Sequence, residues 1–281
     1  MDRSRVAVVR SGRGHGSGYV LGGRLVLTAA HVLRDPAQVS VQLPGRPGRV
    51  PCEVVWQRCE VGPQGWDAAL LLAQGNLSDR PLPAVRWGRL VTTQACTAHA
   101  MGYPLVGQAG ADAVSIVQVD GRVPPVSGRD RDRYVLVGQP GAESQGKDSP
   151  WSGMSGAALW CGSRPGMTPL LAGVVAGDPS GWSHTRLEAV PAYVLASDSR
   201  VRELVEEHTG RPMLLEPADL QHLTDRAPMP PQSPADLLRA DQAVVSFMGR
   251  DELLGDLIRW CEPPSDEAEP APDGEAAKVW R

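Results

Sequence analysis

A serine, a histidine and an aspartate stand in three separate segments of the chain that could together carry nucleophilic catalysis. Ser155 lies between Gly153 and Gly156 in the stretch WSGMSGAAL. His31 ends the apolar run RLVLTAAH, and Asp67 opens the strongly apolar segment DAALLLA. In a Ser-His-Asp triad the serine attacks a carbonyl, the histidine takes its proton, and the aspartate holds the imidazole in the required tautomer. These residues are therefore the candidate catalytic groups.

Each candidate also has a simpler interpretation when it is considered by itself. A histidine on an apolar stretch can be a core residue, a carboxylate before a strand can belong to a turn, and Gly-Ser turns are common. A carboxylate beside a core strand is costly unless it is hydrogen-bonded, which favours a partner such as a histidine N–H. Glycines around Ser155 permit a tight turn, in which the N–H groups of Gly153 and Ser155 would form an oxyanion hole.

The segments that must position these residues are short and strand-like. From residue 5 to about residue 197, short runs of aliphatic or β-branched residues are bounded by Gly, Pro, Asp or Ser. Examples are RVAVVR and QVSVQL in the first half and VSIVQVD and LLAGVVAG in the second. Regular short strands without helices between them are typical of an all-β barrel or sandwich.

Together, the three catalytic segments resemble those of the trypsin-like (chymotrypsin-fold) serine proteases. The order His, Asp, Ser is that of the family, and so are the contexts TAAH, WDAALL and GMSGAAL, with GSGYVL, MGYP and LAGVVAGD as supporting marks. The resemblance implies an all-β fold of two six-stranded antiparallel Greek-key barrels, followed by a C-terminal helix and a helical and linker tail. The protease domain would span residues 1–197, with barrels at about 5–95 and 96–197.

The resemblance also implies a role for each residue. Ser155 would attack the scissile carbonyl, His31 would act as its base, Asp67 would orient His31, and the amides of Gly153 and Ser155 would hold the oxyanion. Met154 departs from the pattern, because secreted trypsins carry there an aspartate that pairs with a newly cut N-terminal ammonium. We therefore expect a site that is not matured by N-terminal cleavage, as in intracellular or HtrA-like relatives.

Specificity is harder to infer from the same resemblance. By position, the base of the S1 pocket, which receives the substrate side chain before the scissile bond (P1), falls at Ser149 beside Asp148. The wall of the pocket falls at Ala176, Gly177 and Asp178. Either aspartate would favour a basic P1 residue, but a turn carboxylate is the preferred interpretation of both.

Composition and charge exclude several function classes. The 281-residue chain has a formal net charge of −4 and no prominent Lys/Arg run, so we expect no direct nucleic-acid partner. No signal peptide or membrane-length apolar segment is visible, so we expect no membrane association. No metal-ligand spacing occurs, and we expect neither metal nor cofactor. The other histidines are expected to be structural or surface residues: His15, His99, His184, His208 and His222.

Cysteine usage indicates the compartment. The five cysteines are scattered and form no C-x-x-C pair. Without a secretion signal, such a set predicts reduced thiols and a cytoplasmic location. A disulfide between Cys52 and Cys59 is the less favoured alternative.

The residues after the predicted barrels change character. Residues 198–210 have helical periodicity, with Asp198 or Ser199 as the N-cap, and are expected to form the C-terminal helix of the protease. Residues 211–261 are predicted to be a Pro-rich linker that ends in an amphipathic docking helix. Residues 262–281 are predicted to be an acidic linker.

Part of this tail resembles the lead-in to STAND-type P-loop ATPases. The match lies in SFMGRDELLGDLIRWC and includes Phe247, Gly249, Arg250, Glu252 and Leu253. It implies a C-terminal ATPase or sensor module in the same polypeptide and an oligomer formed through that module, with KVWR opening a strand before a phosphate loop that is not in this sequence. The alternative is that this helix packs back on the barrels.

The sequence thus predicts an intracellular serine endopeptidase that acts on protein or peptide substrates. The tail suggests that it is the effector of a signalling or antiphage defence ATPase protein. Two alternatives remain: a catalytically silent protease-fold module that binds peptides, and an assembly module that docks partners through residues 198–261.

Overall fold

The computed structural model describes residues 2–60, 66–104, 115–138, 149–162, 168–179, 184–224 and 255–256. The chain divides into two units, residues 1–225 and 226–281, and nearly all described residues belong to the first. Apart from residues 255–256, the expected docking helix and acidic linker lie outside the described residues, as do the residues that match the ATPase lead-in.

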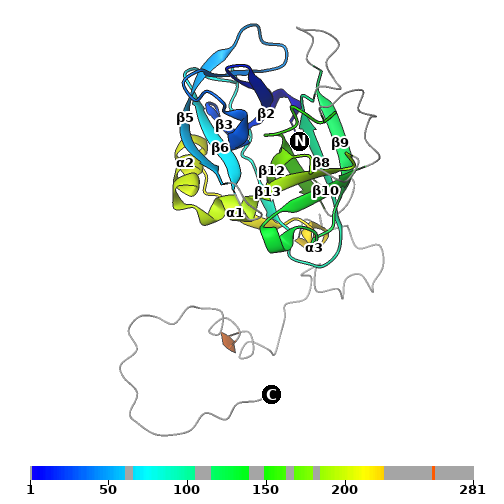
Figure 1. Ribbon diagram of the computed structural model, residues 1–281. Helices are drawn as coiled ribbons and strands as arrows, with labels where there is room; N and C mark the ends of the chain where they lie inside the picture. Colours follow the sequence, from blue (N-terminus) through cyan, green and yellow to red (C-terminus); the bar gives the residue numbers. More distant parts are fainter. Residues whose placement is uncertain are drawn as a thin grey trace, which may run out of the picture. The chain divides into compact units, whose positions relative to one another are not determined.

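Six antiparallel strands close into a first barrel in the order β1-β2-β3-β6-β5-β4 (Figure 1). The strands are β1 (Val6–Ser11), β2 (Gly14–Val20), β3 (Leu25–Thr28), β4 (Val39–Gln42), β5 (Val50–Cys59) and β6 (Asp67–Ala73). Alternating side chains point inward along them, as the period of a strand requires. The interior is filled by aliphatic residues such as Ala7, Val9, Val26, Val41 and Leu71.

The second barrel repeats the strand order of the first. Its strands are β8 (Cys96–Gly102), β9 (Val117–Val123), β10 (Tyr134–Gly138), β11 (Ala158–Gly162), β12 (Leu170–Gly177) and β13 (Arg186–Pro191). They run β8-β9-β10-β13-β12-β11, and pairing of β11 with β12 closes the ring. The predicted fold of two six-stranded antiparallel barrels is confirmed, although no internal repeat is visible in the sequence.

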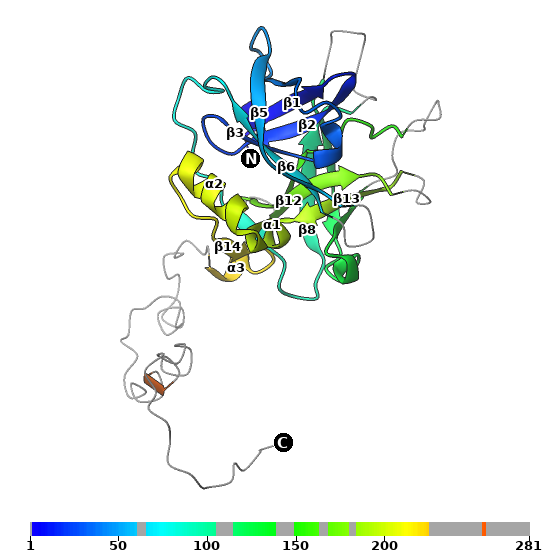
Figure 2. The same ribbon diagram turned by 60° about the vertical axis from the view of Figure 1, so that its left-hand side comes forward.

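The two barrels lie side by side (Figure 2), and a hydrophobic cluster that is separate from their interiors contains residues of both. Tyr19 from β2 meets Trp160 from β11 in an edge-to-face contact, with ring centroids 5.1 Å apart. Leu27 and Leu70 on the first barrel and Val174 on the second are almost fully buried in the same cluster. Burial of aromatic and aliphatic surface therefore fixes one barrel against the other, which matters because the candidate triad is divided between them.

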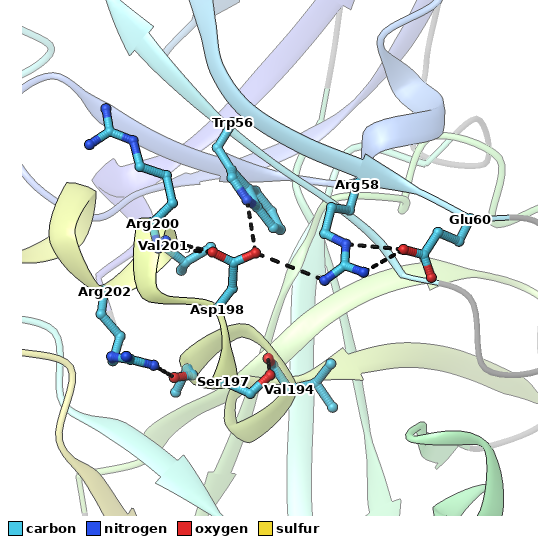
Figure 3. A network of polar contacts seen from close by, with 10 residues as sticks. Trp56, Arg58, Glu60, Val194, Ser197, Asp198, Arg200, Val201 and Arg202 are labelled. Carbon is cyan, nitrogen blue, oxygen red and sulfur yellow. Dashed lines mark hydrogen bonds and ion pairs between the residues drawn. The ribbon is translucent and has the colours of Figure 1, made fainter.

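Two helices follow the second barrel, α1 (Ala192–Ser197) and α2 (Ser199–Thr209). Asp198 is the N-cap of α2, as the sequence predicted: its Oδ1 accepts from the backbone N–H groups of Arg200 (2.9 Å) and Val201 (3.4 Å). Its Oδ2 accepts from the indole Nε1–H of Trp56 (3.3 Å) in β5, and Arg58 lies nearby (Figure 3). One carboxylate thus starts the helix and fastens it to the first barrel.

Replacing Asp198 by alanine should therefore reduce stability. Loss of the cap and of the acceptor for the Trp56 N–H should together cost about 2 kcal/mol. For a domain of this size that corresponds to a melting temperature lower by roughly 4–8 °C, measurable by circular dichroism. Asp79→Ala is the matched control, because that exposed carboxylate makes a surface ion pair with Arg46. Equal melting temperatures for the two variants would contradict the role given to Asp198.

Residues 213–224, which the sequence analysis assigned to the linker, belong to the folded unit instead. Strand β14 (Leu215–Pro217) pairs in parallel with β7 (Trp87–Arg89), and helix α3 (Gln221–Thr224) follows. The Asp219 carboxylate accepts from the backbone N–H groups of Val91 and Thr92. Proline richness was misleading here, because proline is tolerated on an edge strand.

The structure also bears on the membrane question. Among the described residues, no helix is both long enough and apolar enough to cross a bilayer.

Candidate active site

The histidine and the aspartate of the predicted triad form a close pair on the first barrel. His31 sits in the short 3₁₀ helix η2 (Ala30–Val32) after β3, and Asp67 is the first residue of β6. The imidazole Nδ1–H donates to Asp67 Oδ2 (2.6 Å), and the backbone N–H of His31 donates to Oδ1 (3.0 Å). Because Nδ1 carries the proton, Nε2 is left as the basic nitrogen. This pairing explains why a carboxylate, that of Asp67, stands at the start of an apolar strand.

Ser155 lies in a glycine-dependent turn that leads into β11. Gly153 has φ +99° and Gly156 has φ +88°, a region that L side chains rarely adopt. A Cβ on Gly156 would also collide with the carbonyl oxygen of Ser17 and with the hydroxyl of Thr28. The turn at Ser155 therefore requires glycine both for its backbone conformation and for its close approach to the first barrel.

Two amides of this turn have no hydrogen-bond partner among the described residues. The N–H of Met154 donates to the carbonyl of Trp151 (2.8 Å), and the N–H of Gly156 donates to Val175 (2.7 Å). By contrast, no hydrogen bond within the described part of the chain uses the N–H of Gly153 or of Ser155. These are the two donors predicted for the oxyanion hole, and such pairs are suited to stabilising a tetrahedral oxyanion.

Ser17 on β2 connects this turn to the first barrel. Its backbone N–H donates to the carbonyl of Ser155 (2.7 Å) and its hydroxyl donates to the carbonyl of Gly153 (2.7 Å). The same hydroxyl accepts from the N–H of Tyr103 (2.9 Å), while the carbonyl of Ser17 accepts from the hydroxyl of Thr28 (2.7 Å). Ser17 is fully buried. We call it the clamp serine, since it holds the peptide groups that flank the N–H groups of Gly153 and Ser155.

The sequence analysis did not single out Ser17. It lies within GSGYVL, which served only as a supporting mark for the family. A small polar residue between glycines in an otherwise apolar strand was the available signal. Its partners lie far along the chain, and no local pattern identifies them.

The hydroxyl of Ser155 faces the second barrel. It donates to the carbonyl of Ala176 (3.2 Å), and no hydrogen bond between the described residues joins it to His31. Ala176 is one of the residues predicted to line the substrate groove. Catalytic hydrogen bonds often tighten only in the complex with substrate, so a rotamer change at Ser155 would be part of engaging the base.

Ser149 and Asp178, two of the predicted specificity residues, are hydrogen-bonded to each other. Asp178 also contacts His184, for which no such role was predicted. The Ser149 hydroxyl donates to Asp178 Oδ2 and accepts from the N–H of Trp151 (3.1 Å). His184 Nδ1 lies 2.5 Å from the same Oδ2. The sequence analysis expected His184 to be a structural or surface residue, because nothing in its local context indicates a partner. Gly177 ends β12 beside this cluster, and Asp148 lies outside the described residues.

Comparison with known families identifies the fold. Residues 16–164, more than half of the chain, match the trypsin-like peptidase domain. The chain belongs to this family. A comparison of this peptidase domain with curated proteins finds no match.

Solved structures of proteases share the architecture of this trypsin-like domain. A Glu endopeptidase in complex with MPD is 15% identical, with 74% of this chain and 92% of that chain covered and a TM-score of 0.51. An inactivated protease paralogue of the scabies mite is 12% identical, with 76% and 97% covered and a TM-score of 0.51. At such identities the likeness concerns the fold.

The side chain of Met154 has a structural role in this trypsin-like domain. It is 1% exposed and packs in the core of the second barrel. A Cβ on Gly102 would lie 2.9 Å from its sulfur, which shows how closely β8 approaches. The turn before Ser155 is therefore anchored by buried apolar surface and by the clamp serine, and not by an ion pair at this position.

His15 also borders the turn around Ser155, on the side of Gly153. A Cβ on Gly153 would lie 2.8 Å from His15 Nε2. Burial, and secondarily the charge of Arg10, lower the pKa of His15. Burial likewise lowers the pKa of His99 in β8. Both effects favour the neutral imidazole.

Proposed function

We propose that this chain is a serine endopeptidase that cleaves peptide bonds in protein or peptide substrates. The observation that carries the proposal is the His31–Asp67 pair on one barrel together with Ser155 on the other, in a turn whose Gly153 and Ser155 amides are unused. Membership in the trypsin-like peptidase family supports it. No single element of this set would be sufficient, since fold does not determine function.

In the proposed reaction, each catalytic group acts once during acylation of Ser155 and once during hydrolysis of the acyl-enzyme. Ser155 Oγ forms a bond to the scissile carbonyl carbon while its proton passes to Nε2 of His31. The carbonyl oxygen becomes an oxyanion that accepts from the N–H groups of Gly153 and Ser155. His31 then gives its proton to the leaving amine as the C–N bond breaks. Water repeats the sequence on the acyl-enzyme and releases the acid, while Asp67 stabilises the imidazolium throughout.

A catalytically silent peptide-binding module is the second candidate. One of the structures that share the fold is an inactivated protease paralogue, so the fold is compatible with the absence of catalytic activity. In addition, the hydroxyl of Ser155 donates to the carbonyl of Ala176 and not to His31. The intact residues His31, Asp67 and Ser155 favour the active form.

A covalent probe distinguishes the two candidates. The 281-residue protein is incubated with a fluorophosphonate, which reacts with activated serines, and labelling is followed by gel fluorescence and by mass spectrometry. We expect stoichiometric labelling at Ser155 that is abolished in Ser155→Ala and retained in Ser78→Ala, a loop serine outside the site. A folded protein that is not labelled, and does not cleave denatured protein substrates, would support the silent module.

We further propose that the peptidase works in the cytoplasm, as the effector of an ATPase or sensor module in the same polypeptide that also oligomerises it. This part rests on the sequence match within residues 246–261 and on free cysteines, of which the described part contains Cys52, Cys59, Cys96 and Cys161. In a polypeptide that joins this chain to such a module, nucleotide and oligomeric state should change the peptidase rate. A rate that responds to neither would contradict the coupling.

A further inference from the structure

A cavity of about 120 Å³ lies at one end of the first barrel. Its lining comes from the segments just before β1, at the end of β2, just after β4 and after β6, and includes Arg5, Val20, Leu43 and Leu77. Antiparallel pairing of β1 with β2 and with β4 brings these strand ends together. The cavity is therefore built mainly on the framework of the barrel.

This cavity is separate from the candidate active site. His31 follows the end of β3 and Asp67 begins β6, whereas Val20 pairs near the start of β3 and Leu77 follows the end of β6. The candidate catalytic pair and the cavity thus lie at opposite ends of the first barrel. A ligand in the cavity would leave the surroundings of Ser155 free.

The inner wall of the cavity is apolar. Val20, Leu43 and Leu77 belong to the hydrophobic cluster that fills the first barrel, and Leu82 packs against it. Protein interiors are close-packed, and side chains that border an empty space lose dispersion contacts on that side. A short aliphatic group placed in the cavity would restore those contacts and continue the core of the barrel.

Arg5 brings a buried positive charge to the same cavity. The residue is 3% exposed, and its Nη2 donates to the carbonyl of Pro83. Its Nε is buried and has no hydrogen-bond partner in the described part of the chain, since Asp2 Oδ2 lies 3.7 Å away, beyond hydrogen-bond range. A buried polar group that lacks a partner is costly and requires an explanation.

Arg46 brings a second positive charge, at the mouth of the cavity. Its side chain is 35% exposed and pairs with the carboxylate of Asp79 (2.5 Å), which is itself 90% exposed. Such exposed ion pairs contribute little free energy, so Arg46 can turn toward a ligand at small cost. Ser4 and Pro44, which also line the cavity, are exposed residues, so a ligand can enter from solvent.

The lining selects the chemistry of the ligand. It contains two arginines, and none of the described residues that line the cavity is acidic. A guanidinium binds a carboxylate through short, charge-assisted hydrogen bonds, often two in parallel. A cation would be repelled, a neutral apolar molecule would leave the charge of Arg5 without a counterion from the ligand, and inorganic phosphate would leave the apolar wall uncovered.

The volume limits the size of the ligand. An apolar cavity of about 150 Å³ holds one benzene molecule. A cavity of about 120 Å³ therefore accommodates roughly five or six non-hydrogen atoms. Nucleotides and long-chain fatty acids are too large to be enclosed.

We propose that this cavity binds a small carboxylate with a short aliphatic chain, with Arg5 as the inner and Arg46 as the outer cationic partner. A free short-chain acid and the C-terminal residue of a peptide present this same chemistry. The site does not depend on the proposed peptidase function, because it shares no residue with the candidate triad.

A titration followed by nuclear magnetic resonance tests the site. Butyrate, neutral butyramide and inorganic phosphate are each added to the isotope-labelled 281-residue protein carrying Ser155→Ala. We expect butyrate to shift the amide signals of residues 4–5, 43–46 and 77–82, and to bind at least about tenfold more tightly than the other two compounds. Equal binding of butyrate and butyramide, phosphate binding as tight as that of butyrate, or shifts confined to the surroundings of Ser155 would overturn the proposal.

Variants of the two arginines locate the charge that matters. Arg5→Met should abolish the preference for butyrate over butyramide. If this buried change prevents folding, Arg46→Gln decides, because its partly exposed position tolerates substitution; it should weaken butyrate binding about threefold or more and leave butyramide unaffected. Arg80→Gln is the matched control, since it makes the same charge change on an exposed residue that does not line the cavity. Equal effects of Arg46→Gln and Arg80→Gln would contradict the site.

A peptide arm distinguishes the two sources of the ligand. The tripeptide Gly-Gly-Val is titrated with a free C-terminal carboxylate and as its C-terminal amide, again into Ser155→Ala so that no cleavage occurs. Binding of the free carboxylate form more tightly than butyrate, with loss of binding in the amide, would assign the site to a chain end. Binding of butyrate without binding of the tripeptide would assign it to a free acid.

Discussion

Replacement of Asp67 by asparagine is expected to lower kcat for peptide hydrolysis by about 10⁴-fold, with the fold intact. Both oxygens of the carboxylate are engaged by His31, one by the ring and one by the backbone N–H. An asparagine amide can present its N–H₂ group to Nδ1, which would stabilise the tautomer with the proton on Nε2. That tautomer cannot accept the proton of Ser155.

The measurement is single-turnover acylation with an activated ester and with a peptide, which separates chemistry from product release. Asp79→Asn, an exposed aspartate whose carboxylate pairs with Arg46, is the control and should retain full activity. A loss of less than tenfold in Asp67→Asn would mean that the pair is structural and that His31 is not the general base.

Replacement of the clamp serine, Ser17, by alanine should reduce both stability and turnover. The carbonyl of Gly153 and the N–H of Tyr103 would lose their buried partner, at a cost of about 2–4 kcal/mol in the free energy of unfolding. Without this hydrogen bond, the peptide group that joins Gly153 to Met154 keeps the bond from the Met154 N–H to Trp151 but loses the partner of its carbonyl, and it is held less firmly. Since the adjacent amides are the proposed oxyanion donors, kcat should fall about a hundredfold while KM changes little.

Ser11→Ala provides a closely matched control. Ser11 is also fully buried, and its hydroxyl likewise donates to a carbonyl and accepts from an amide, both belonging to Asp35. Ser11→Ala should lose comparable stability, as measured by urea unfolding, without the hundredfold loss in kcat. Equal kinetic effects in the two variants would show that Ser17 acts through stability alone.

The sequence was informative wherever a function depends on a local pattern. His31, Asp67 and Ser155 each stand in a short motif, and the strand-like runs predicted both barrels. The pairing of Asp67 with His31 then follows from how β3 and β6 lie together in the first barrel. The two glycines beside Ser155 likewise indicated the turn, because only glycine adopts the positive φ angles found there without strain.

Features that depend on contacts between distant segments could not be predicted. The hydroxyl of Ser17 meets the carbonyl of Gly153 across 136 residues of chain, and the hydroxyl of Ser149 meets Asp178 across 29 residues. The misassigned segment 213–224 has the same cause. Its proline content describes local conformation, whereas its pairing with β7 depends on an edge that only the folded barrel provides.

The clamp at Ser17 has a consequence for the order in which the candidate site would form during synthesis. Chains are synthesised from the N-terminus, and domains tend to fold as they emerge from the ribosome. The first barrel would thus carry a formed His31–Asp67 pair while the nucleophile is still unmade. Even after Ser155 is translated, the carbonyls of Gly153 and Ser155 reach their hydrogen-bond donors on Ser17 only when the two barrels dock. A nascent or half-folded chain would accordingly be inert, and proteolytic competence would be the last property to appear during biosynthesis.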